Sequence, residues 1–186
     1  MIDTEKIKKS TSSIIEAIGE DPQREGLVGT PRRMAALYEE FFSGLGQDPG
    51  EVLATGFEEN HREMVVFKDI SFISMCEHHF LPFFGTADIG YIPNGRVVGA
   101  SKLARALDIL ARRPQIQERL TTQIADTIVA ALSPEGVGVV LSAEHMCMSL
   151  RGVKKLGSKI VTIASRGSIK SHEATRREFE TLLREG

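Results

Sequence analysis

Cys76-Glu77-His78-His79 and, much later in the chain, His145-Met146-Cys147-Met148 are the two stretches that a fold of this sequence has to bring together. They contain the only two cysteines, and each cysteine has histidine close by. The C-x-x-H spacing of Cys76 and His79 does not suit one face of a strand, because residues three apart point to opposite sides. It suits a turn around a metal ion, and Cys147 would add a third ligand from elsewhere in the fold.

The residues alone leave several kinds of site open. Three Cys and His ligands leave one tetrahedral position free, as in catalytic zinc sites, whereas His78 or His145 as a fourth ligand would close a structural site. A buried cysteine beside a core histidine is also common without any metal. A disulfide between Cys76 and Cys147 is disfavoured, because nothing marks the chain as secreted.

Length and charge limit the class of protein. The 186 residues suffice for one substantial core with an added helical segment. A net charge of −2 argues against nucleic acid as a partner, so that local cations would have to hold any anionic ligand. The start of the chain is charged and lacks a signal peptide, and no run approaches the roughly 20 apolar residues that span a membrane. We therefore expect a cytoplasmic protein without a membrane partner.

The pattern predicts two helices ahead of the main fold. Residues 3–19 carry isoleucines at helical spacing, and Thr30-Pro31 opens a second helix with threonine as the N-cap. We expect residues 1–60 to form an N-terminal helical segment and residues 61–186 to form the catalytic domain.

The main part of the chain reads as an α+β fold. Strands are predicted at 64–67, 70–73 and 80–92, followed by a helix capped by Ser101 and a second helix over 116–132. Strands return at 137–143 and 158–165, and a helix over 175–183 closes the chain. The order strand-strand-helix-helix-strand-strand predicts an antiparallel sheet with the two helices on one face.

Polar residues at the two helix starts are candidates for ligand binding. Ser101, Lys102 and Arg105 stand where free backbone N–H groups favour an anion, although an ordinary solvated basic face gives the same pattern. Glu118 opens the next helix, either as a favourable first-turn charge or as an acceptor for the N–H groups of a guanine.

Four longer runs, in this order, resemble the GTP cyclohydrolase I family. The likeness extends from Thr30-Pro31-Arg32-Arg33 to Thr175-Arg176-Arg177-Glu178-Phe179. The runs are Cys76-Glu77-His78-His79-Phe80-Leu81-Pro82-Phe83, Val98-Gly99-Ala100-Ser101-Lys102-Leu103-Ala104-Arg105, Arg113-Pro114-Gln115-Ile116-Gln117-Glu118-Arg119-Leu120-Thr121 and His145-Met146-Cys147-Met148-Ser149-Leu150-Arg151-Gly152.

The resemblance implies a tunnelling fold assembled into rings, commonly a homodecamer of two stacked pentamers. It implies conversion of GTP and water into formate and 7,8-dihydroneopterin triphosphate, the first step of pterin synthesis for folate or biopterin. A guanine anchor and a zinc ion from different subunits would share each pocket. The implied roles are zinc ligands for Cys76, His79 and Cys147, catalysis for His78 and His145, guanine binding for Gln117 and Glu118, and ribose or triphosphate binding for Ser101, Lys102, Arg105, Arg151 and Arg33.

The chain departs from the family pattern after Ser158-Lys159, where the family tends to have hydroxyl-bearing residues and then an aromatic one. This chain has Ile160, Ile163, Ala164, Arg166 and Ile169 there instead. This affects ring packing or the tunnel lining more than the zinc site. Two alternatives remain: a nitrile reductase of the same fold, which uses a cysteine nucleophile without zinc, and a silent paralogue that binds GTP or a pterin. The matched C-x-x-H and H-x-C stretches argue against the first, and the presence of both histidines and Glu118 argues against the second.

Overall fold

The computed structural model describes residues 2–184 and divides into two compact units, Met1–Ser43 and Gly44–Gly186. The first unit holds α1 (Thr4–Ala17) and α2 (Thr30–Phe41), which confirms both predicted helices. The N-cap of α2 is Gly29 rather than Thr30, so the predicted cap was wrong by one residue. No helix within residues 2–184 combines the length and the apolar character needed to cross a membrane.

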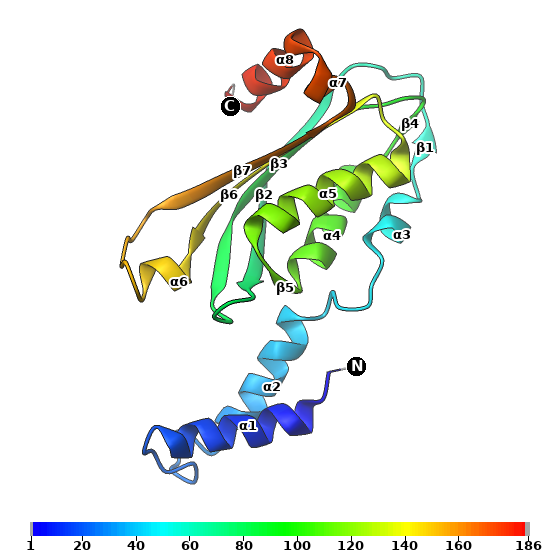
Figure 1. The fold of residues 1–186 in the computed structure, drawn as a ribbon. Coiled ribbons are helices and arrows are strands. Elements are labelled where there is room, and N and C mark those ends of the chain that lie inside the picture. The colour runs from blue at the N-terminus through cyan, green and yellow to red at the C-terminus, as the bar shows by residue number, and fades with distance from the viewer. Residues whose placement is uncertain (1, 185–186) are drawn as a thin grey trace. The chain divides into compact units, whose positions relative to one another are not determined.

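The second unit is built on a five-stranded sheet with the strand order β5-β2-β3-β6-β7. Its helices and strands follow one another as α3 (Pro49–Leu53), β1 (Phe57–Glu58), β2 (Val65–Cys76), β3 (Pro82–Ile92), β4 (Arg96–Val97), α4 (Ala100–Ala111), β5 (Pro114–Gln115), α5 (Gln117–Leu132), β6 (Gly136–His145), α6 (Met146–Ser149), β7 (Lys159–Arg166), α7 (Gly167–Ser171) and α8 (Glu173–Arg184). The sequence β2, β3, α4, α5, β6, β7 confirms the predicted α+β order, and Figure 1 shows α4 and α5 together on one side of the sheet.

The core lies between this sheet and the two helices. Alternate residues of β3 and β6, such as Ile89 and Leu141, are fully buried, while α4 and α5 contribute Leu107 and Ile124 to the same cluster. The period of two along the strands and of nearly four along the helices is the pattern from which the sheet and helices were predicted.

One long strand replaces the two short ones that the sequence predicts before Cys76. β2 runs unbroken from Val65 to Cys76, but its pairing with β3 shifts register between Phe67 and Ile70. Within this bulge Asp69 has a φ of 53°, and its backbone N–H donates to Asp88 Oδ1 at 2.8 Å. The polar Lys68-Asp69 pair, which read as a strand break, is therefore a β-bulge.

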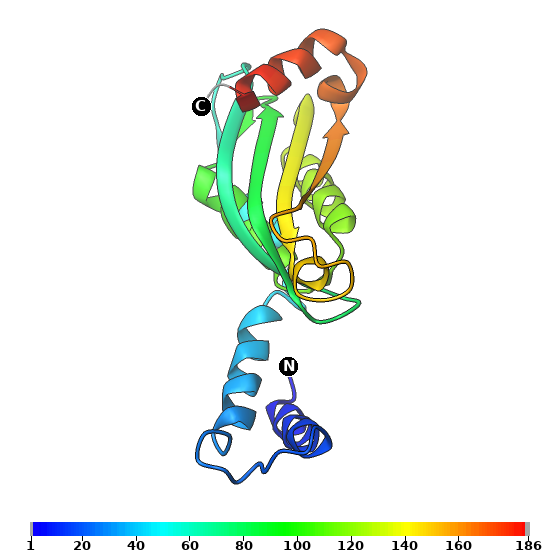
Figure 2. The ribbon, with the colours of Figure 1, turned by 90° about the vertical axis from the view of Figure 1, so that its left-hand side faces the viewer.

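The closing helix α8 lies on the sheet face opposite to α4 and α5, as Figure 2 shows at one end of the strands. Its Phe179 is fully buried against Gly90 of β3 and Gly138 of β6. A Cβ added at either glycine would lie 2.6 Å from the Phe179 ring, so these two glycines provide the space in which the ring packs.

The strand ends define where a site can form. Met75 pairs with Pro82, Phe83 pairs with His145, and Cys76 pairs with Gln115, so the end of β2, the start of β3 and the end of β6 meet at one edge. The short parallel β5 brings the start of α5 to the same edge, because α5 begins two residues after Gln115.

Candidate metal centre and substrate site

The turn after β2 presents two histidines while keeping Cys76 buried. It is closed by hydrogen bonds from Cys76 N–H to the Leu81 carbonyl at 3.0 Å and from Phe80 N–H to the Cys76 carbonyl at 2.9 Å. Phe80 has a φ of 47°, a left-handed conformation that a non-glycine residue adopts only where the surroundings fix it. His78 and His79 project from this turn and are exposed.

The three predicted metal ligands come together from two distant parts of the chain. Cys76 ends β2, His79 lies in the turn, and Cys147 lies in α6, yet their ligand atoms are all within 4.8 Å of one another. The distance from Cys76 Sγ to His79 Nδ1 is 4.0 Å. A tetrahedral zinc ion with bonds of about 2.3 Å to sulfur and 2.0–2.1 Å to nitrogen would separate such atoms by roughly 3.5–3.8 Å.

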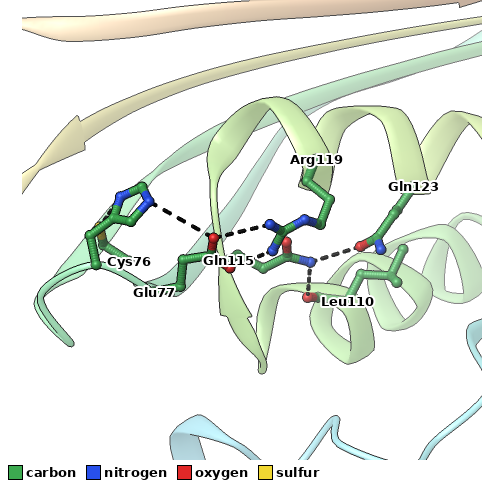
Figure 3. A network of polar contacts seen from close by, with 7 residues as sticks. Cys76, Glu77, Leu110, Gln115, Arg119 and Gln123 are labelled. Carbon is green, nitrogen blue, oxygen red and sulfur yellow. Dashed lines mark hydrogen bonds and ion pairs between the residues drawn. The ribbon is translucent and has the colours of Figure 1, made fainter.

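An ion pair joins the metal turn to α5. Arg119 donates to both carboxylate oxygens of Glu77, at 2.6 and 3.0 Å, as Figure 3 shows. The hydrogen bond from Arg119 lowers the pKa of Glu77, so the carboxylate stays charged. The His78 ring lies between Glu77 and Cys76. Its Nε2 is 3.9 Å from Glu77 Oε1, and its Nδ1 is 3.9 Å from Cys76 Sγ.

Buried Gln115 fixes the two helices behind this turn. Its Nε2 donates to the Leu110 carbonyl of α4 at 3.0 Å and to Gln123 Oε1 of α5 at 2.8 Å, contacts that Figure 3 also shows. Its backbone carbonyl accepts from Glu77 N–H at 2.9 Å. One residue therefore ties the metal turn, the end of α4 and the first turns of α5 together.

Glu144 holds the segment that carries Cys147. Its Oε1 accepts from Ser149 Oγ at 2.6 Å and from Gly157 N–H at 3.2 Å, and these bonds lower its pKa. Burial, followed by the nearby Cys76 thiol, raises the pKa of Cys147. A metal ion bound here must therefore displace a proton from Cys147, since the thiolate is the ligand.

His145 and the start of α5 form the second part of the site. His145 lies parallel to the Phe83 ring, with ring centroids 4.6 Å apart, and its Nε2 lies 2.8 Å from Gln117 Oε1. Burial lowers the pKa of His145, and the charge of Glu118 partly offsets this. Glu118 is exposed, whereas Gln117 is only 1% exposed.

The predicted ribose- or triphosphate-binding residues of the second unit are not gathered in one place. Arg151 lies at the metal centre, where its Nη1 contacts His79 Nε2 at 2.8 Å. Arg33 belongs to the first unit and donates to Thr30 Oγ1 at 2.8 Å. Lys102 is half-buried, and both Ser101 and Arg105 are exposed, all three in the first half of α4. The N-cap of α4 is Gly99, so the cap predicted at Ser101 was wrong.

The first half of α4 lies at the opposite end of the sheet from the metal centre. The backbone N–H of Val98, just before α4, donates to the Tyr91 hydroxyl at the far end of β3. At the other end of α4, the backbone carbonyl of Ala111 accepts a hydrogen bond from Ser74 Oγ, near Cys76. At 1.5 Å per helical residue, Ser101 is about 15 Å along the helix from Ala111. The start of α4, with Ser101 and Lys102, therefore lies away from the cluster of its own chain.

The prediction that different chains supply the guanine anchor and the metal stays a prediction, and within one chain the start of α5 already lies beside the metal turn. Gln117 contacts His145 of the same chain, and Arg119 contacts Glu77 of the same chain. The physical reason is the parallel pairing of β5 with β2, which starts α5 directly beside Cys76.

The sequence interpretation missed the residues that support the ligands: Glu77, Arg119, Gln115, Glu144 and Ser149. Glu77 and Arg119 stood in the quoted runs, with opposite charges, but only the fold shows that they pair. Glu144 alternates with the buried residues of β6, and in the sequence this spacing indicates only an ordinary outward-facing position.

Comparison with known proteins gives a consistent result. A family model described as GTP cyclohydrolase I matches residues 7–184. The chain is 59% identical to GTP cyclohydrolase 1 of Dehalococcoides mccartyi strain 195, covering 100% of this chain and 99% of that protein. It is 56% identical to GTP cyclohydrolase 1 of Halalkalibacterium halodurans, with 98% of each chain covered.

Among solved structures, the archaeosine synthase QueF-Like in the apo form aligns with 56% of this chain and 93% of its own chain. The sequence identity is 21% and the TM-score is 0.45.

Proposed function

This chain belongs to the GTP cyclohydrolase I family and is an enzyme, and from that premise we propose that it uses zinc to convert GTP and water into formate and 7,8-dihydroneopterin triphosphate. This reaction would make it the first enzyme of a pterin pathway. The observation that carries the proposal is the convergence of Cys76, His79 and Cys147 within 4.8 Å at one end of the sheet.

The donor set fits zinc better than a hard cation. Two thiols and one imidazole are soft or intermediate ligands, whereas magnesium and calcium take oxygen. Three protein ligands leave a fourth position for water or substrate. When bound, zinc would lower the pKa of a coordinated water towards neutrality and so supply a nucleophile for C8 of guanine.

Two further histidines at this edge of the sheet, His78 and His145, supply proton transfers. Attack at C8 moves electrons onto N7, and His78, exposed beside the metal ligands, is placed to donate a proton there. Opening and reclosing the ribose requires further proton transfers, for which His145 is the second imidazole at this edge. Glu118 is the exposed carboxylate able to accept both N1–H and the 2-amino group of guanine, a pair that adenine does not offer.

Arg151 is the cation at the cluster for the triphosphate. A guanidinium only donates, so His79 Nε2 accepts its hydrogen bond and Nδ1 faces the Cys76 thiol. Binding of zinc through Nδ1 would leave the hydrogen of the neutral imidazole on Nε2. Nε2 could then no longer accept the hydrogen bond from Arg151. Arg151 would then be free to contact a phosphate group.

The position of the other predicted ribose- or triphosphate-binding residues of the second unit supports a homo-oligomer. Ser101, Lys102 and Arg105 lie in the first half of α4, whose start is at the far end of the sheet from the cluster of their own chain, so we assign them to the pocket of a neighbouring chain. We propose a ring assembly, with the decamer of two stacked pentamers as its form. Each pocket would combine the metal, Glu118 and His145 of one chain with α4 of another.

Replacing Arg119 with glutamine is expected to loosen the metal turn without unfolding the chain. The variant loses the two hydrogen bonds to Glu77, and zinc should pass to an excess of chelator roughly three- to tenfold faster than from the wild type. The matched control is Arg177→Gln, which removes an exposed Arg–Glu pair on α8. Equal release rates in Arg119→Gln and the control would show that the Glu77 pair does not support the metal.

The direct test of the function is incubation of the pure, zinc-loaded protein with GTP. We expect equal amounts of formate and of a pterin product that fluoresces after oxidation, with no product from ATP. Binding of GTP without release of formate would identify a silent paralogue instead.

A further inference from the structure

The Gln117 side chain, assigned to guanine by family resemblance, is buried with all its donors engaged. Its Nε2 lies 3.1 Å from the Leu141 carbonyl, 3.0 Å from the Ile160 carbonyl and 3.1 Å from Thr162 Oγ1. With 1% of its surface exposed, this amide has no edge to offer a base.

The hydrogen-bond network fixes which way the amide points. The two backbone carbonyls only accept hydrogen bonds, so the nitrogen must face them. Thr121 Oγ1 donates its one hydrogen to the backbone carbonyl of Gln117 at 2.7 Å, so in the 2.6 Å contact between Thr121 and Thr162 the donor is Thr162. Thr162 therefore presents a lone pair to Gln117 and also requires nitrogen on that side. Oε1 is left facing His145.

This orientation determines the proton arrangement on His145. Gln117 Oε1 lies 2.8 Å from His145 Nε2, and an amide oxygen only accepts, so Nε2 must carry a hydrogen. The parallel contact with Phe83, 3° between planes, holds the ring against rotation. In the neutral imidazole Nδ1 is then the nitrogen without a hydrogen.

We propose that Gln117 is a positioning residue that keeps His145 in its Nε2–H tautomer, so that Nδ1 is the atom through which His145 exchanges protons with substrate. Glu118 alone remains as the side chain that recognises guanine. The substrate part of this inference rests on the proposed function, whereas the tautomer rests only on the contacts of Gln117, Thr121, Thr162 and His145.

The tautomer can be measured in the full-length, zinc-loaded wild type. Protein labelled with ¹⁵N in its five histidines gives long-range ¹H–¹⁵N spectra, and the His145 signals are assigned by their loss in His145→Ala. At alkaline pH, where the imidazole is neutral, we expect the pattern of a protonated Nε2 and a bare Nδ1. A protonated Nδ1, or an equal mixture of tautomers, would overturn the proposal.

Two variants separate positioning from guanine binding. Gln117→Leu removes the acceptor, so the tautomer preference should be lost and kcat should fall about tenfold or more, while KM for GTP stays within about twofold. Thr162→Val keeps the Oε1 contact with His145 and should keep the Nε2–H tautomer.

The opposite pattern would reject the inference. A raised KM in Gln117→Leu with an unchanged His145 spectrum would show that Gln117 binds the base. If Gln117→Leu does not fold, the wild-type spectrum still decides the tautomer. A wild type that shows the Nε2–H tautomer but releases no formate from GTP would reject the proposed function and leave the tautomer assignment standing.

Discussion

Replacing Cys147 with serine is expected to remove the zinc ion and GTP turnover together. Cys147 supplies one of three ligand atoms that lie within 4.8 Å of one another, and serine offers no thiolate in its place. Without a metal to activate water, turnover should fall by about three orders of magnitude or more. Metal analysis and formate release on the same preparation would measure both effects.

A control in the same short helix distinguishes ligand loss from local damage. Met148→Leu changes the residue next to Cys147 in α6 without adding or removing a metal ligand, and it should keep both zinc and turnover. Full zinc content in Cys147→Ser would remove Cys147 from the metal centre. Loss of zinc in both variants would point to a disturbed α6 instead.

Mixing two inactive variants is expected to restore activity when one carries Arg105→Ala and the other Cys147→Ser. The first keeps an intact metal cluster and lacks the Arg105 guanidinium of α4, whereas the second keeps Arg105 and lacks the cluster. In rings formed by unfolding and refolding the two together, about a quarter of the pockets would combine both intact parts. Formate release from the mixture, compared with each variant refolded alone, measures the recovery.

The control pair is Glu118→Ala with Cys147→Ser. Glu118 lies close enough to His145 of its own chain to affect its pKa, so both substitutions damage the same part of the pocket. No mixed pocket would then be intact, and activity should not return. Recovery in this pair, or none in the Arg105→Ala pair despite confirmed mixed rings, would show that the pocket is divided between chains in another way.

The sequence predicted the sheet, the two covering helices and the residues of the candidate metal centre because each of these is marked by a local pattern or motif. Apolar alternation marks β3 and β6, and helical spacing marks α5, which begins within one residue of its predicted start. Cys76, His79 and Cys147 were predictable as a set because C-x-x-H and a later cysteine form a recognisable ligand pattern.

Other features depend on contacts between distant residues, which no local pattern records. A glutamine at a helix start looks the same whether it faces a ligand or the core, and only the Leu141 and Ile160 carbonyls show that Gln117 faces inward. The side of the sheet taken by α8 depends on the space at Gly90 and Gly138. The separation of Lys102 from the metal centre depends on the direction in which α4 crosses the sheet.

X-ray absorption at the zinc edge of the purified protein tests the proposed metal centre most directly. Cys76, Cys147 and His79 predict two sulfur atoms at about 2.3 Å and nitrogen or oxygen atoms at about 2.0–2.1 Å, with the last position taken by water or substrate. Addition of GTP should change the oxygen contribution and leave both sulfur atoms in place. A spectrum without sulfur neighbours, or zinc-free protein that releases formate from GTP at full rate, would contradict a catalytic zinc ion at this cluster.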